Sequence, residues 1–167
     1  GVSLPEPARP LAEGHAVDFI IEECLTAGPG GMTLCPIGPM TNIAMAIVKE
    51  PAILSHIREI VFMGGAAFRA GNVTPYSEFN IHADPHAAEI TLASGAPCVM
   101  MGLDVTLQTE ITNSRLAALA DIDHPSAQAV VEMLGFYATR ISEIGESRGE
   151  SGKKAVLHDP CTIAYLL

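Results

Sequence analysis

Basic residues are scarce in this chain of 167 residues, which has 9 Lys and Arg against 19 Asp and Glu and a formal net charge of −10. A field of that sign repels polyanions such as DNA and RNA. We therefore expect no nucleic-acid partner, and a small neutral ligand or a cation is easier to accommodate.

Long apolar segments and paired cysteines are also absent. No apolar run approaches ~20 residues, the length of a membrane helix, so no membrane association is expected. The first ten residues, GVSLPEPARP, contain three prolines and no apolar segment typical of a secretory signal, which predicts an extended lead-in. No C-x-x-C pair occurs, which argues against zinc or a disulfide framework and predicts buried thiols in the reducing cytoplasm. The cysteines are Cys24, Cys35, Cys98 and Cys161.

Sequence motifs for phosphate and for activated serine are missing as well. The chain has no G-x-G-x-x-G and no G-x-S-x-G, and GESGKK lacks the spacing and the preceding strand of a phosphate loop. These absences disfavour a Rossmann-like nucleotide binder, which stays a weaker alternative.

His82 and His86 are four positions apart, a spacing that could bind a metal on one face of a helix. Pro85 predicts a helix start between them, so we expect no shared metal-binding face.

Apolar residues make up 49% of the chain, enough for a buried core. The length predicts a single α/β domain over residues 1–167, or a part of a larger domain. Apolar residues at helical spacing alternate with short Ile-, Val- and Met-rich runs, which predicts a mostly parallel, Rossmann-like sheet flanked by helices. The expected strands lie within 31–38, 57–65 and 96–106, and the expected helices within 11–28, 41–51, 84–95, 112–121, 124–147 and 158–167.

Two further features of the chain are loops. The polar, Gly-rich segment 145–157 predicts a mobile loop. The stretch from Gly64 to Asp84 shows little helical periodicity and far exceeds the usual connection of about two to six residues, and loops of that length are usually functional. It follows a predicted strand, and ligands bind beyond the carboxyl ends of parallel strands.

The side chains of this long loop suit two different purposes. Its Glu and Asn residues offer donors and acceptors for a polyhydroxyl ligand such as a sugar, but the same groups could satisfy the backbone of the loop itself. Asp84 and Asp159, each directly before a proline, are candidate helix caps.

Four segments together resemble the inosine-uridine-preferring nucleoside hydrolase family. They are, in chain order, IGPMTNIA, FMGGAAFRAGNVTPYSEFNIHADPHAAE, GLDVT and HDPCTIAYLL. The resemblance covers nearly the whole chain, and the block from Met-Gly-Gly to Asp-Pro is its most specific part. It implies that the complete protein hydrolyses the N-glycosidic bond of ribonucleosides to ribose and a free base, with the help of one calcium ion.

The resemblance also implies a set of ribose-binding residues. Asn72, Glu78 and Asn80 match the residues that hold the ribose hydroxyls, and Met63 matches a residue that lines the sugar. Such roles agree with the chemistry, because cleavage of an N-glycoside builds positive charge on the sugar, which an acidic pocket favours.

Catalytic and metal-binding roles are implied for three more positions. The backbone carbonyl of Thr41 and the carboxylate of Asp159 match two calcium ligands, and Asp159 also lies close to the ribose in the family. His158 matches a histidine near the leaving base that is proposed to donate a proton. Calcium prefers hard oxygen ligands of this kind.

One family motif is missing from this chain. The family's aspartate cluster, D-x-D-P-G-x-D-D, does not occur, so the chain resembles an internal portion of the fold. Without the strand that carries the cluster, apolar sheet edges would be exposed, which predicts a homo-oligomer. Two interpretations stay open: a calcium-dependent ribonucleoside hydrolase in its complete form, and a non-catalytic sugar- or nucleoside-binding or assembly fragment. The sequence does not predict a preference for purine or pyrimidine bases.

Overall fold

A computed structural model of the chain describes residues 4, 9–147 and 155–167. It divides into two compact units, which we describe separately. The helical unit comprises Gly1–Leu11 and Leu107–Leu157, and the sheet unit comprises Ala12–Thr106 and His158–Leu167. The single domain expected from the sequence stays a prediction. Most of the expected extended lead-in lies outside the described residues.

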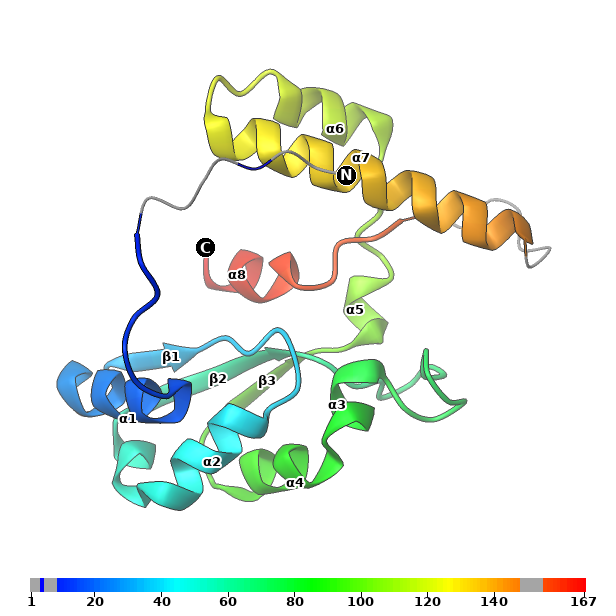
Figure 1. Cartoon of the computed structure of the whole chain (residues 1–167). Coiled ribbons are helices and arrows are strands. Elements are labelled where there is room, and N and C mark those ends of the chain that lie inside the picture. The colour runs from blue at the N-terminus through cyan, green and yellow to red at the C-terminus, as the bar shows by residue number, and fades with distance from the viewer. Residues whose placement is uncertain (1–3, 5–8, 148–154) are drawn as a thin grey trace. The chain divides into compact units, whose positions relative to one another are not determined.

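A parallel sheet of three strands forms the centre of the sheet unit (Figure 1). The strands β1 (Met32–Leu34), β2 (Ile57–Met63) and β3 (Cys98–Met101) lie in the order β1-β2-β3. Each expected strand is present, and the α/β class with a parallel sheet is confirmed. Met63 pairs with Met101, so β2 and β3 end at the same level and their exits lie side by side.

Helices surround this sheet. Those of the sheet unit are α1 (Ala16–Ala27), α2 (Thr41–Lys49), the 3-10 helix η1 (Pro51–Ser55), α3 (Phe79–Ala83), α4 (Pro85–Ala93), α5 (Leu103–Thr106) and α8 (Pro160–Leu166). The longer ones match the expected helices, because their apolar spacing and Asp-Pro starts are strong signals.

Two short helices were not expected from the sequence. The long loop was expected to be irregular up to Asp84, but α3 occupies its last turn, where the Glu78 side chain caps it. The third strand was expected to continue to Thr106, but it ends at Met101 and α5 follows. The β-branched Val105 and Thr106 are typical of strands, and tertiary contacts override that preference here.

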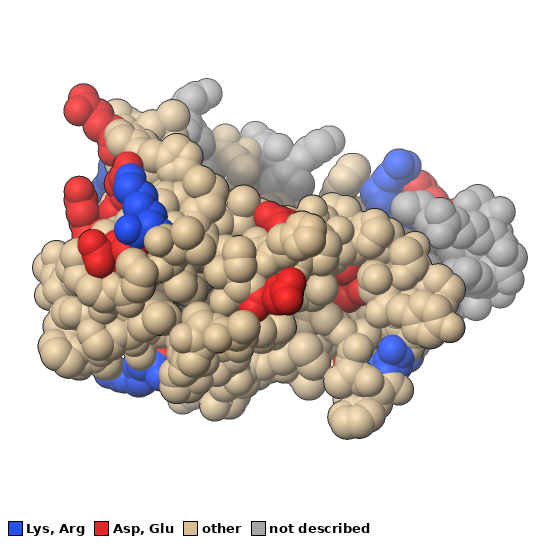
Figure 2. Space-filling view, turned by 90° about the horizontal axis from the view of Figure 1, so that it is seen from below, with Lys and Arg blue, Asp and Glu red and all other residues tan. Residues whose placement is uncertain are grey.

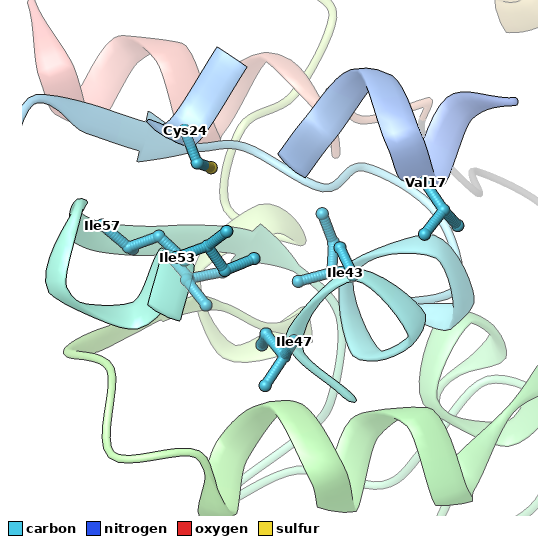
Figure 3. Packing of buried hydrophobic residues seen from close by; sticks show 8 residues of the cluster. Val17, Cys24, Ile43, Ile47, Ile53 and Ile57 are labelled. Carbon is cyan, nitrogen blue, oxygen red and sulfur yellow. The ribbon is translucent and has the colours of Figure 1, made fainter. Parts of the chain in front are cut away.

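The core of the sheet unit centres on β2, where Ile60 and Val61 are fully buried. Side chains from α1, α2, η1 and β2 point toward one another in the cluster drawn in Figure 3. The labelled members are Val17, Cys24, Ile43, Ile47, Ile53 and Ile57. Burial of each large aliphatic side chain contributes about 1.5–3 kcal/mol, so this cluster holds the strand and the helices together.

The helical unit contains α6 (Asn113–Ala120) and α7 (Pro125–Ser147), both expected from the sequence. α7 continues through Gly135 without interruption. A bridge between Glu110 and Val156 was not expected. Of the loop expected at 145–157, the first three residues belong to α7, and residues 148–154 lie outside the described residues.

Charged side chains are sparse on the face of the molecule shown in Figure 2. The face drawn in Figure 2 consists mostly of uncharged residues, with a few acidic and basic side chains distributed over it. Over the described ranges, no helix has both the length and the apolar character needed to cross a membrane.

Cys24 and Cys161 are buried, whereas Cys35 and Cys98 are partly exposed.

Candidate functional site

Backbone hydrogen bonds join the segments that follow β2 and β3. The Gly64 N–H donates to the Met101 carbonyl at 3.4 Å, and the Leu103 N–H donates to the Gly65 carbonyl at 2.9 Å. A Cβ atom on Gly102 would lie 2.8 Å from the Gly65 carbonyl oxygen, which is too close for any side chain. Glycine at this position therefore lets the two strand ends meet, and this edge of the sheet is where a ligand site is expected.

The Glu78 side chain joins the long loop to the exit of β2 by hydrogen bonds. Its side chain is only 3% exposed, and its carboxylate accepts from three backbone N–H groups. The donors are Gly65 N at 2.9 Å, Asn80 N at 2.9 Å and Ile81 N at 3.2 Å. The carboxylate thus caps α3 and joins it to the end of β2, which gives Glu78 a structural role whatever it binds.

Other polar groups of the loop also bind its own backbone. Thr74 Oγ1 accepts from Ser77 N at 2.9 Å, and Asn72 Oδ1 accepts from Phe79 N at 2.9 Å. From α5, the Asp104 carboxylate accepts from Ala67 N at 2.8 Å and from Phe68 N at 3.0 Å. These two N–H groups hold the pKa of Asp104 below its usual value. Much of the loop's polarity therefore fixes its shape.

Two of the predicted ribose-binding side chains keep groups available for a ligand. Asn80 Nδ2 donates to the Met63 carbonyl at 2.9 Å, so these two predicted residues lie together at the end of β2. Within the described part of the chain, Asn80 Oδ1 and Asn72 Nδ2 have no hydrogen-bond partner. An acceptor and a donor of this kind suit the hydroxyl groups of a sugar.

His158 is partly buried just before the start of α8. Burial lowers its pKa, and the negative charges of Asp159 and Glu78 act in the opposite direction. Asp159 is the chain neighbour of His158, whereas Glu78 lies 80 positions earlier in the sequence. His158 Nδ1 also lies 2.8 Å from Thr106 Oγ1.

The two candidate helix caps differ in the structure. Asp84 Oδ1 accepts from Ala87 N at 3.0 Å and caps α4, as expected. Asp159 makes no side-chain capping bond to α8, so its expected role as a cap is wrong. Its backbone already has helical angles, φ −61° and ψ −40°, whereas a capping residue normally has an extended backbone. The Asp159 carboxylate is therefore available for another partner.

The predicted calcium ligands lie in different cavities. Thr41 lines a cavity of about 450 Å³ together with Asp84, whose Oδ2 accepts from Thr41 Oγ1 at 2.6 Å. Asp159 lines another cavity, of about 390 Å³, with Cys35 and Ile37. No group of three or more His, Cys, Asp or Glu side chains in the described ranges could hold a metal ion. Calcium takes about six to eight oxygens, so the described residues do not by themselves fit it.

Thr106 and Asp104 were missed as site residues by the sequence analysis. Both belong to the GLDVT segment, which was part of the family resemblance but from which no site residue was predicted. The one available signal was their position, because polar residues directly after a buried parallel strand lie at the ligand-binding edge. Asp104 binds the N–H of Phe68, 36 positions earlier, and Thr106 contacts His158, 52 positions later. Partners at such distances along the chain cannot be found from local spacing.

The fold is that of an α/β protein, and its long polar loop, Asn80 and Met63 lie at the carboxyl edge of the parallel sheet, where a small-molecule site is expected. The chain belongs to the inosine-uridine-preferring nucleoside hydrolase family, whose model matches residues 1–167.

Individual relatives are similar over the whole chain. The chain is 44% identical, over 167 residues, to a pyrimidine-specific ribonucleoside hydrolase, RihA, from Photobacterium profundum. It is 42% identical, also over 167 residues, to an uncharacterized protein of Schizosaccharomyces pombe. Each match covers 100% of this chain and 52% of the relative. Among solved structures, a purine-preferring ribonucleoside hydrolase from Gardnerella vaginalis superposes with a TM-score of 0.88 at 38% identity, covering 99% of this chain and 51% of that one. The chain thus spans about half the length of these relatives.

Proposed function

We propose that the complete protein hydrolyses the N-glycosidic bond of ribonucleosides and releases ribose and a free base. The observation that carries this proposal is the meeting of Asn80 and Met63 at the exit of β2, where Asn80 Nδ2 donates to the Met63 carbonyl at 2.9 Å. The names of the relatives also support it, because they include hydrolases of both pyrimidine and purine ribonucleosides. A base preference is therefore not part of the proposal.

In this reaction, Asn72 and Asn80 bind the ribose hydroxyls through their open amide groups, and Met63 lies against the sugar. Glu78 contributes negative charge beside the ribose while it holds the loop. As the C–N bond breaks, positive charge develops on the ribose ring, and the carboxylates of Glu78 and Asp159 stabilise it. The bond electrons leave with the base, and His158 supplies a proton to the base nitrogen. The oxygen of a water molecule bonds to the anomeric carbon, and that water gives up a proton to the solvent, which completes the ribose.

Calcium assistance belongs to the complete protein in this proposal. The Thr41 carbonyl and the Asp159 carboxylate would be two of its oxygen ligands, and the remaining ones would come from outside the described residues. We assign no step to the ion. We further propose that the protein acts in the cytoplasm in nucleoside salvage and assembles as a homo-oligomer.

The test is an assay of ribose release from inosine and uridine, with calcium and with a chelator. It compares the complete coding sequence with the 167-residue chain. Turnover by the complete protein that the chelator abolishes supports the proposal. A complete protein that releases no ribose from either nucleoside contradicts it. Nucleoside binding by calorimetry without any turnover would instead favour the non-catalytic binding module.

A matched pair of variants tests the predicted ribose contact. Asn80→Ala removes an amide at the strand exit, whereas Asn113→Ala removes an exposed amide at the start of α6. We expect Asn80→Ala to lower kcat/KM by about 10- to 100-fold, because it removes both a ligand contact and the bond to Met63. Asn113→Ala should match the wild type. Equal activity of the two variants would remove Asn80 from the site.

A further inference from the structure

Thr106 is the last residue of α5, and its side chain is fully buried. Its hydroxyl oxygen lies 2.8 Å from Nδ1 of His158, which is 52 positions further along the chain. The contact lies within the sheet unit and links the exit of β3 to the start of α8. A buried hydroxyl at this distance forms a hydrogen bond with the ring, and such a bond fixes the orientation of the imidazole.

The two nitrogens of a histidine ring have distinct roles, and the partner of one decides what the other can do. Because Nδ1 of His158 is bound to Thr106, Nε2 is the nitrogen that remains for a ligand. A threonine hydroxyl within a helix can donate its own proton to a carbonyl one turn earlier. Its lone pairs then accept a hydrogen bond, and the acceptor role suits an Nδ1–H group.

We propose that Thr106 is a positioning residue whose hydroxyl oxygen accepts a hydrogen bond from the Nδ1–H of His158 and presents Nε2 to the leaving base. This inference rests on the proposed function for its catalytic meaning, but the hydrogen bond itself does not depend on any activity. Neither the family match nor the resemblance assigns a role to this threonine.

The proton balance follows from this arrangement. In the imidazolium form of His158 both ring nitrogens carry a proton. Transfer of the Nε2 proton to a nitrogen of the leaving base forms one N–H bond and breaks another, and it leaves a neutral ring. The remaining proton stays on Nδ1 and continues to donate to Thr106, and water restores the Nε2 proton in the next cycle. Thr106 thus keeps the same partner in both states of the ring.

The first test measures the tautomer of His158 by 15N NMR of the ring at a pH where the ring is neutral, with the signal assigned by a His158→Gln variant. We expect the wild type to carry its proton on Nδ1, although free histidine in water prefers Nε2. Thr106→Val replaces the hydroxyl by a methyl group of similar size and should shift the tautomer toward Nε2–H. Thr106→Ser retains the hydroxyl and should retain the wild-type tautomer.

The second test measures kinetics in the complete protein with the same matched pair. Thr106→Val should lower kcat by about 10- to 100-fold, since a poorly oriented catalytic group loses rate of this order. KM should stay within about threefold, because Thr106 makes no contact with the ribose in this proposal, and Thr106→Ser should stay close to the wild type. Circular dichroism and thermal melting of both variants verify that they fold.

Each outcome decides one of the two proposals. An Nε2–H tautomer in the wild type, or an unchanged tautomer in Thr106→Val, overturns the positioning role. Equal kcat values for the Val and Ser variants in an active protein also overturn it. A complete wild-type protein that hydrolyses no ribonucleoside instead removes the proposed function, and the NMR result still decides whether Thr106 orients the ring.

Discussion

At the scale of single residues, the Glu78 carboxylate has two potential uses. It was expected from the resemblance to bind ribose, and in the structure it binds backbone N–H groups at the start of α3 and at Gly65. The two uses are compatible, because a carboxylate has about four acceptor positions. A substitution at Glu78 therefore affects stability and ligand binding together, and a loss of activity alone does not identify a ligand contact.

We expect Glu78→Ala to lower the free energy of unfolding by about 1–3 kcal/mol, because it leaves buried N–H groups without an acceptor. Urea denaturation followed by circular dichroism measures the change. The matched control is Glu89→Ala on the exposed face of α4, which should change stability by no more than about 0.5 kcal/mol. Equal denaturation midpoints for the two variants would show that Glu78 does not hold the loop.

Asp104 gives a prediction about pH. Hydrogen bonds from the Ala67 and Phe68 N–H groups hold its folded-state pKa below the ordinary value of 3.8. A depressed carboxylate pKa stabilises the folded loop above the unfolded-state value, and that contribution is lost as the pH falls through the lower folded-state value. The amide NMR signals of Ala67 and Phe68 should therefore shift with a midpoint below 3.8, and Asp104→Asn should abolish this transition. A midpoint at or above 3.8 would contradict the contact.

Helices and strands show where sequence reasoning succeeds. Long elements such as α1 and β2 were predicted because their apolar spacing reflects the face that they bury. α3 was missed because its cap is Glu78, a residue type that is rarely expected to cap a helix. α5 was missed because four residues are too few to show a period. Short elements of this kind depend on tertiary contacts, which the sequence does not display.

The candidate site was also predictable only in part from the sequence. The resemblance identified Asn80, Met63 and His158, and the structure explains how the first two meet at the end of β2. The Thr106 contact was not predictable, since it joins two segments through a single hydrogen bond. The metal ligands were predicted as a pair, but no metal-binding cluster exists among the residues that the structure describes.

The junction of β2 and β3 supports a prediction at the scale of elements. Gly102→Ala would place a Cβ atom 2.8 Å from the Gly65 carbonyl oxygen. This oxygen belongs to the backbone, so the clash cannot be relieved by a side-chain rotation. We expect a loss of about 1–3 kcal/mol in unfolding free energy, as is typical when a packed site is overfilled. Gly38→Ala is the control, because its Cβ would meet nothing within 4 Å. Thermal melts that do not separate the two variants would mean that the strand exits can move apart.

At the scale of the whole molecule, the sheet has only three strands, and within the described residues β1 and β3 each pair on one side. Relatives are about twice as long as this chain. In the part of the chain that the structure describes, β1 and β3 are therefore edge strands, and open edges favour association between chains.

Light scattering across a concentration series should accordingly show that the isolated chain self-associates, whereas the complete protein should form an oligomer of defined size. Replacing Thr33 in β1 by Lys places a charge on an edge strand and should reduce association of the isolated chain, while Thr91→Ser in α4 should not. A monomeric isolated chain at all concentrations would argue that its edges are already protected.

Asp84 serves two segments of the chain at once, since one oxygen caps α4 and the other binds the Thr41 hydroxyl, 43 positions earlier. Evolution can therefore not alter these two positions independently without cost. Among homologues, loss of the hydroxyl at position 41 should accompany a change of residue at position 84 more often than chance allows, so that the pair leaves a covariation signal linking the two helix starts.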